Sequence, residues 1–289
     1  MTYLLARFAD TLTDSGQWTL DDRLAHLTAW ENAILQKNPS LWKLKGTLGT
    51  FSESEVQLLL IGGPLIEALK ALSERSQDLS LAVLKTLISA MKWDLKTFSA
   101  ATTAQPVYGC RDLATFDWYC VSIAGCVGAY WVKVFDLPQN LENLAIEYGK
   151  GLQRINILRD CMEDFQRGRV YLPQDLLKKF EIEETNFWTS ITWRDFVLDY
   201  LAETRKLLRY GANFCDAIPY KNWRLRWASM MPVQIGLETL SKLESEILDP
   251  QSKTKISRAQ VRALVWRTSL DVLLNRKLSP RIRTRGEAS

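Results

Sequence analysis

The chain has 289 residues and a formal net charge of +4 at pH 7, from 37 Lys and Arg against 33 Asp and Glu. So mild a charge gives no support to a nucleic-acid partner. A hydrophobic content of 47% with eleven Trp suffices for a large core or an apolar cavity. No secretory signal follows Met1 and no run of about 18 uncharged apolar residues occurs. We therefore expect a cytoplasmic protein without a transmembrane helix, with peripheral contact to a membrane as an alternative.

The residues that most often carry metal or nucleophile chemistry are sparse. The five cysteines lack metal-ligand spacing and are expected to be reduced thiols. The single histidine, His26, lies in DDRLAHLTAW and is expected to be an ordinary helix residue. Catalysis by a His triad or by His-ligated zinc is therefore not expected.

Helical periodicity runs along most of the chain, and β-hairpin signals are nearly absent. The pattern predicts helices at residues 2–13, 21–37, 53–74, 78–101, 112–135, 139–166, 193–215, 221–247 and 259–275. The third of these is expected to form two pieces joined at Gly62-Gly63-Pro64, and Gly168 is expected to cap the sixth.

These helices predict an all-α fold, organised as one domain over residues 1–275 with the helices around a central cavity. Residues 276–289, RKLSPRIRTRGEAS, are expected to form a basic, disordered tail. Contact of this tail with anionic lipid or with a substrate is the alternative.

The first predicted helix carries a stripe of polar residues. Tyr3, Arg7, Asp10 and Asp14 are spaced by 4, 3 and 4 residues, which places them on one face of a helix whose other sides are apolar. Two like charges one turn apart destabilise a helix unless a cation or a partner compensates them. The stripe therefore indicates either a metal-binding face or an internal ion pair between Arg7 and Asp10.

A second stripe follows the same logic. Gln153, Asn156, Asp160 and Asp164 are spaced by 3, 4 and 4 residues on a helix with apolar residues between them. Carboxylates suit Mg²⁺, and arginine forks suit phosphate oxygens. The sequence therefore predicts a magnesium-diphosphate site, with four arginines around the second stripe, namely Arg154, Arg159, Arg167 and Arg169.

The two segments resemble the signatures of the squalene and phytoene synthase family, the head-to-head prenyl synthases. The first matches Y-x-x-x-R-x-x-D-x-x-x-D, from Tyr3 to Asp14. The second, from Gln153 to Pro173, matches Q-x-x-N-I-L-R-D-x-x-E-D-x-x-x-G-R-x-Y-L-P, which is long and specific. YCVSIAGCVGAYWVKVF is similar to a third signature and begins at Tyr119, and AMKWDL at 90–95 is a weaker fourth.

The resemblance implies an isoprenoid-synthase fold and the condensation of two farnesyl diphosphates in one cavity. Mg²⁺, with Mn²⁺ as an alternative, would bind four carboxylates and help diphosphate to leave. Tyr3 and Tyr119 would lie near the reacting carbons and steady positive charge or remove a proton. The implied metal ligands are Asp10, Asp14, Asp160 and Asp164. The implied substrate-binding residues are Arg7, Gln153, Asn156, Arg159 and Arg169.

Two glycines of the third signature, Gly125 and Gly128, lie inside a predicted helix, where glycine costs about 1 kcal/mol against alanine. Something must approach the backbone closely there. Close packing against another helix and contact with a prenyl chain are the two alternatives.

The spelling DTLTD at 10–14 resembles the squalene synthase form and favours squalene as the product, with NADPH as the hydride donor. Phytoene, dehydrosqualene and hydroxysqualene synthases are the alternatives within the family. Non-catalytic assembly factors with this fold are the alternative from another class, although they typically lack the acidic motifs. The family also has one or two helices ahead of the first motif that this sequence does not contain, so part of the diphosphate pocket is expected to be missing.

Overall fold

The computed structural model describes residues 1–14, 18–44, 46–49, 51–182, 187–246 and 256–282. Within these ranges the chain is almost entirely helical, which confirms the predicted all-α class. Its contacts divide it into two compact units, Met1–Ala100 and Ala101–Ser289, and each is described here by itself. No helix in the described ranges is long and apolar enough to cross a membrane.

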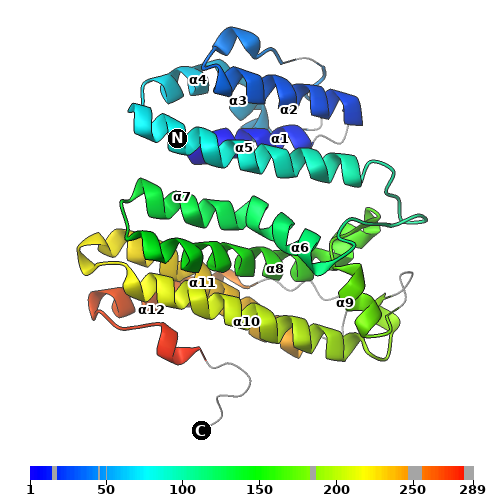
Figure 1. Cartoon of the computed structure of the whole chain (residues 1–289), viewed down its shortest axis with the longest axis vertical. Helices are drawn as coiled ribbons and strands as arrows, with labels where there is room; N and C mark the ends of the chain where they lie inside the picture. Colours follow the sequence, from blue (N-terminus) through cyan, green and yellow to red (C-terminus); the bar gives the residue numbers. More distant parts are fainter. Residues whose placement is uncertain (15–17, 45, 50, 183–186, 247–255, 283–289) are drawn as a thin grey trace. The chain divides into compact units, whose positions relative to one another are not determined.

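The first unit is a small helical bundle. Its helices are α1 (Thr2–Thr13), α2 (Leu20–Leu35), α3 (Glu53–Leu60), α4 (Gly62–Lys70) and α5 (Glu74–Thr97), with a 3₁₀ turn at Pro39–Leu41 (Figure 1). Helix α1 packs against both α2 and α5. The predicted break near Gly62 is confirmed and falls at Ile61, between α3 and α4.

The core of the first unit is built on an aromatic stack. The rings of Phe8 and Trp30 lie 3.8 Å apart between centroids, and Trp42 meets Phe8 edge-on at 5.0 Å. Phe8 and Trp30 are fully buried, as is Leu5. The Trp30 indole donates a hydrogen bond to the backbone oxygen of Leu5 at 3.3 Å. Apolar spacing along α1 therefore fixes which side of this helix faces the core and leaves the polar stripe on the other side.

His26 has the ordinary structural role expected of it. It is 7% exposed and stacks on Trp18 at 4.2 Å. Its Nδ1 is hydrogen-bonded to the backbone oxygen of Asp22 at 2.7 Å. The residue belongs to the packing of α2, whose start is fixed by a capping box between Thr19 and Asp22.

The second unit contains the remaining helices and one pair of two-residue parallel strands. Its elements are β1 (Val107–Tyr108), α6 (Leu113–Cys120), a π-helical turn (Val121–Gly125), α7 (Cys126–Val134), α8 (Glu142–Gln166), β2 (Arg169–Val170), α9 (Gln174–Lys179), α10 (Trp193–Ala217), α11 (Trp223–Ser245) and α12 (Arg258–Leu273), with 3₁₀ turns at Gln139–Leu141, Phe187–Thr189, Tyr220–Asn222 and Ser279–Arg281.

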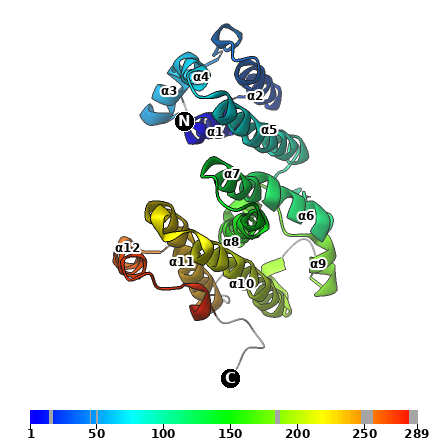
Figure 2. The same ribbon diagram turned by 60° about the vertical axis from the view of Figure 1, so that its left-hand side comes forward.

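Helix α8 is the central element of this unit. It packs against α6, α7, the π-helical turn, α10 and α11, and it lies between α7 and α10 in both views (Figure 1 and Figure 2). A Cβ at Gly128 would overlap the backbone oxygen of Ala145, and a Cβ at Gly149 would overlap that of Ala124. A Cβ at Gly125 would lie 3.1 Å from the oxygen of Ile146. Close helix packing therefore accounts for Gly125 and Gly128, with α8 as the partner.

Three features of the second unit differ from the sequence predictions. Helix α9 and the β1–β2 pair were not predicted, because six-residue and two-residue elements carry too little periodicity to detect. Residues 276–282 of the basic tail pack against the second unit, contrary to the expected disorder, and the rest of the predicted tail, 283–289, lies outside the described residues. Leu278 and Ile282 are buried, and the Arg281 guanidinium makes two hydrogen bonds to the buried carboxylate of Asp271. Burial of two apolar side chains and a bidentate ion pair outweighs the polar composition of this stretch.

The close approach of α7 to α8 predicts a large effect of one methyl group. Gly128→Ala places a Cβ against the Ala145 backbone, and we expect it to lower the free energy of unfolding by about 3 kcal/mol. Denaturant titration followed by far-ultraviolet circular dichroism measures this change. Gly63→Ala in α4 is the control, since its nearest neighbour would be Pro39 Cβ at 3.9 Å. Equal stability of both variants would contradict the close packing.

The thiols are predicted to be unreactive in the folded chain. Burial raises the pKa of Cys161 to about 12 and that of Cys126 to about 11, so the thiolate needed for attack on a disulfide reagent is scarce at about pH 8. Burial also raises the pKa of Cys120 and Cys215. We expect Ellman's reagent to titrate the thiols rapidly only after denaturation. A full equivalent reacting within seconds in the native protein would be inconsistent with this burial.

Candidate functional site

The predicted polar stripe of α8 is present as a half-buried face. Gln153, Asn156, Asp160 and Asp164 are all partly accessible, whereas Ile155, Ile157 and Leu158 between them are buried, as expected for a helix with a core on its other sides. The four side chains come together on one helix because their spacing matches the helical repeat. This arrangement presents two amides and two carboxylates in line along about three turns.

Arg159 is paired with the first of these carboxylates. Its Nε donates to Asp160 Oδ1 at 2.7 Å, and its Nη2 donates to Asp160 Oδ2 at 2.5 Å. The hydrogen bonds from Arg159 to Asp160 raise the pKa of the guanidinium further above its ordinary value. The two groups expected to hold phosphate and metal therefore neutralise each other in this structure.

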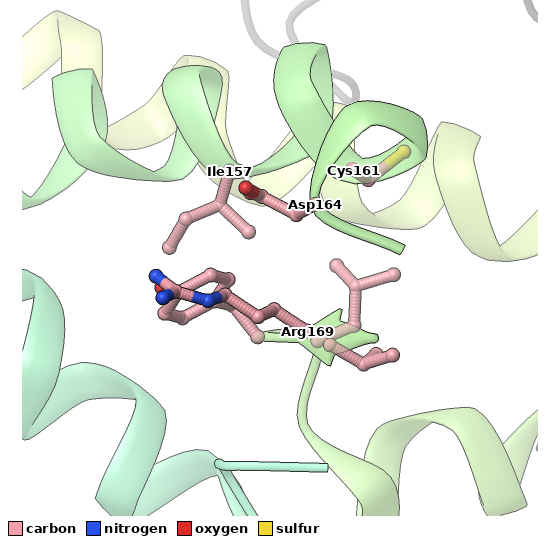
Figure 3. A pocket seen from close by; sticks show the side chains of 7 residues that line it. Ile157, Cys161, Asp164 and Arg169 are labelled. Carbon is pink, nitrogen blue, oxygen red and sulfur yellow. The ribbon is translucent and has the colours of Figure 1, made fainter. Parts of the chain in front are cut away.

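A tight turn after α8 brings Arg169 back under the helix. Gly168 has φ of +75°, which is readily accessible only to glycine, and it caps α8 as the sequence predicts. Strand β2 then pairs in parallel with β1, with Val107 opposite Arg169. In Figure 3 the Arg169 side chain runs beneath α8, and Ile157 and Asp164 point toward it from the helix.

These residues line a small pocket in the second unit that has almost no free volume. The pocket is lined by Ile157, Cys161, Asp164, Arg169, Val170, Tyr171 and Leu172. Tyr171 also stacks on Tyr119, with ring centroids 5.2 Å apart and planes 24° apart. Both tyrosines are at least nine-tenths buried. The structure thus brings Tyr119, Asp164 and Arg169 together through Tyr171, which the sequence analysis missed as a site residue although it lies within the GRVYLP signature.

Arg154 does not belong to this face, contrary to the prediction that grouped it with the phosphate-binding arginines. It is 6% exposed, and its Nε donates to Thr204 Oγ1 at 3.2 Å. Its guanidinium lies over the ring of Tyr200 at 4.4 Å and 3.9 Å from the carboxylate of Asp117. An arginine enclosed by an aromatic ring, a hydroxyl and an acid serves the interior of the unit. Arg167, by contrast, is exposed just after the end of α8.

The stripe of α1 belongs to the first unit and is open at one end. Tyr3 is 74% exposed, and Asp14 is exposed at the end of the helix. Arg7 forms an ion pair with Asp10, which is the alternative that the sequence analysis left open, and its Nη2 lies 3.6 Å from Glu55 of α3. The side of α1 that carries Tyr3, Arg7, Asp10 and Asp14 is therefore partly exposed, with Arg7 and Asp10 half-buried and Tyr3 and Asp14 exposed.

The two stripes supply some, but not all, of the oxygen ligands that a hard divalent cation needs. Within the described ranges no group of three or more His, Cys, Asp or Glu side chains is placed to hold a metal ion. Each stripe instead offers two carboxylates one turn apart. That set suits Mg²⁺, which commonly binds one or two carboxylates and takes its other ligands from phosphates and water.

Comparison with known proteins adds the family. The family model described as squalene/phytoene synthase matches residues 1–260. The presqualene diphosphate synthase of Zymomonas mobilis subsp. mobilis is 48% identical over 69 residues, which is 24% of either chain. That of Rhodopseudomonas palustris is 29% identical over 192 residues, covering 64% of this chain and 55% of the relative. Phytoene synthase 1 of Solanum lycopersicum is 30% identical over 176 residues, covering 57% and 41%.

Solved structures support the fold. The squalene synthase HpnC from Alicyclobacillus acidocaldarius is similar with a TM-score of 0.62 at 18% identity, covering 85% of this chain and 81% of that one. TcSQS with a bound ligand is similar with a TM-score of 0.71 at 18% identity, covering 100% and 84%. The matched region spans between about a quarter and about half of the length of the curated relatives named above. With a family model covering residues 1–260, this chain belongs to the squalene/phytoene synthase family.

Proposed function

We propose that this chain condenses two farnesyl diphosphates head to head, with Mg²⁺, and releases presqualene diphosphate as its first product. The single observation that carries the proposal is the polar face of α8, where Asp160 pairs with Arg159 and Asp164 lines a pocket with Arg169. Two relatives named presqualene diphosphate synthase support the choice of product.

In this proposal the carboxylates of Asp10, Asp14, Asp160 and Asp164 hold Mg²⁺, which neutralises diphosphate and makes it a better leaving group. The guanidinium groups of Arg7, Arg159 and Arg169 bind phosphate oxygens, for which their fork geometry is suited.

Two of these arginines are paired with acids of the same stripes, Arg7 with Asp10 and Arg159 with Asp160. Substrate binding in this scheme exchanges both partners: the carboxylate turns to the cation and the guanidinium to diphosphate. The exchange keeps each charge compensated, so neither group is left desolvated and alone.

Departure of diphosphate leaves an allylic cation, which the double bond of the second substrate attacks; the resulting tertiary carbocation then loses a proton as the cyclopropane ring closes. Tyr119 and Tyr171 present stacked rings beside the pocket of Asp164 and Arg169, and ring faces attract positive charge. In the proposal Tyr119 steadies the cation, and Tyr3 serves near the reacting carbons or in proton removal. Gln153 and Asn156 orient the diphosphate by hydrogen bonds from their amides.

A second step, the reduction to squalene with NADPH, was favoured by the DTLTD spelling. Thr11 is fully buried and donates a hydrogen bond to the backbone oxygen of Arg7 at 2.9 Å. Its hydroxyl is thus engaged within α1, and this contact gives no support to one product over another. We therefore propose presqualene diphosphate as the product and treat squalene and phytoene as outcomes of the test.

Product analysis tests the proposal directly. Purified protein is incubated with farnesyl diphosphate and Mg²⁺, with and without NADPH, and the extracts are analysed by mass spectrometry. We expect presqualene diphosphate in both reactions, and we expect no product when EDTA removes the divalent cation.

Each other outcome changes the assignment in a defined way. Squalene formed only with NADPH would restore the reductive second step. Phytoene from geranylgeranyl diphosphate, with no product from farnesyl diphosphate, would replace the substrate. A chain that is folded but gives no product from either substrate would contradict an enzymatic role and favour a non-catalytic assembly factor.

Substitution of the acids tests their roles. Asp160→Asn and Asp10→Asn remove one charge each at nearly constant volume, and we expect each to lower kcat/KM at least a hundredfold, a transition-state loss of about 2.7 kcal/mol. Glu203→Gln is the matched control, because Glu203 is exposed on α10 and lies outside both stripes. Turnover near the wild-type rate in both aspartate variants, or an equal loss in the control, would contradict the metal assignment.

A further inference from the structure

The last helix of the second unit exposes an unusual row of large apolar side chains. On α12, Trp266 is 73% exposed, Leu270 49% and Leu273 70%, and Leu274 just after the helix is 54% exposed. Trp266, Leu270 and Leu273 are spaced by 4 and 3 residues and so share one face. We name these four residues the α12 row. Scattered exposed apolar residues are normal, but a contiguous row on one helix marks an interaction surface.

The row continues into a groove between α12 and the start of α11. The groove has a volume of about 530 Å³ and is lined by Tyr220, Trp223, Trp227, Ser269, Val272 and Leu273. Helices α11 and α12 pack side by side in the second unit, as both views show (Figure 1 and Figure 2). Tyr220 and Trp223 are each nearly half exposed at its rim. Five aromatic or aliphatic side chains thus surround a space that no described residue fills.

Buried charged side chains beneath this surface hold α12 and the segment after it in place. Asp271 is 2% exposed and accepts hydrogen bonds from both terminal nitrogens of Arg281, at 2.5 and 2.9 Å. Arg226 of α11 is 3% exposed and donates to Asn275 Oδ1 at 2.5 Å and to the backbone oxygen of Arg276 at 3.0 Å. These contacts fix α12 against α11, so the apolar row is a preorganised face rather than a frayed end.

The charge on α12 and on the segment after it is mostly positive. Residues 258–282 contain six Lys and Arg but a single acid, Asp271, which is buried and already paired. Arg262 and Arg267 are exposed and flank the row along α12. The guanidinium of Arg224 stacks over Trp223 at 4.7 Å at the rim of the groove. The exposed basic residues of the face are Lys221, Arg224, Arg258, Arg262, Arg267, Arg276 and Lys277.

We propose that this face of α11 and α12 docks onto the surface of a bilayer that contains anionic lipids. Tryptophan, tyrosine and leucine enter the headgroup region, where one end of each ring stays wet, and the surrounding arginines and lysines contact anionic headgroups. Each basic residue near such a surface adds attraction that salt weakens. The charge complementarity favours this occupant over a second copy of the chain, because two copies would set the same basic residues against each other. The inference does not depend on the proposed enzymatic activity.

Vesicle flotation of the full chain tests the proposal. The protein is mixed with vesicles of phosphatidylcholine alone or of phosphatidylcholine with about a third phosphatidylglycerol, at low and high salt. We expect flotation only with the anionic vesicles and a clear loss at high salt.

Two double variants separate the contribution of apolar contact to vesicle binding from the contribution of charge. Trp266→Ser with Leu273→Ser removes apolar contact at the two most exposed positions of the row, so folding should be retained. Arg262→Glu with Arg267→Glu reverses the flanking charges. We expect each pair to weaken vesicle binding at least tenfold. Lys178→Glu with Lys179→Glu on α9, two exposed lysines of the same unit, changes the charge equally and should stay within twofold.

Melting temperatures within a few degrees of wild type show that a loss of binding is not unfolding. Wild-type protein that fails to float with anionic vesicles would overturn the proposal, and so would an equal loss in the α9 control. Sedimentation velocity tests the competing explanation, in which this face joins two copies of the chain. If the wild-type chain is a dimer that the Trp266→Ser and Leu273→Ser pair converts to a monomer, without any change in vesicle binding, the face is an interface between copies instead.

Discussion

The second unit depends on the contact of the backbones of α7 and α8 through glycine. Gly128 of α7 meets the backbone of Ala145 in α8, and Gly149 of α8 meets that of Ala124 in the π-helical turn, with no room for a Cβ at either glycine. Once α8 is fixed on that side, α10 and α11 cover its other apolar sides. The stripe of α8 that carries Asp160 and Asp164 stays partly accessible, as do the neighbouring Arg159 and Glu163. Asp160 lies about three turns after Gly149 and therefore on the same face of α8, so the acids occupy the part of this face that lies beyond the glycine contact.

The arginines show why a charge pattern in a sequence does not reveal a function by itself. Arg154, Arg159 and Arg281 each pair with an aspartate, but their surroundings differ. Arg154 is enclosed by Tyr200 and Thr204 and serves the core of the unit. Arg281 holds the chain end against α12 through buried Asp271. Arg159 pairs with Asp160 where both remain about one-third exposed, so the exchange of partners that a diphosphate site requires costs least there.

Local periodicity predicted most of the fold and much of the candidate site. The bounds of α1, α8 and α10 agree with the sequence to within a few residues, because their apolar spacing is regular over three turns or more. The stripes of α1 and α8 could be predicted for the same reason. The stacking of Tyr171 on Tyr119 and the burial of Arg154 could not, because both depend on contacts between residues far apart in the chain.

The last described residues also show that composition alone did not predict a structure that depends on contacts with distant residues. Residues 276–282 look like a basic tail by composition, yet Leu278 and Ile282 are buried and Asp216 accepts hydrogen bonds from the backbone of Leu278 and Ser279. The segment after α12 therefore supplies hydrogen-bond donors to the buried carboxylates of Asp216 and Asp271. The arginines of α12 stay at the surface. The ion pair between Arg281 and Asp271 thus stabilises α12 and leaves Trp266 and Leu273 exposed beside arginines that have no acidic partner on α12. An acidic lipid surface supplies the charge that this face lacks, whereas an electroneutral partner would leave its arginines partly desolvated without compensation.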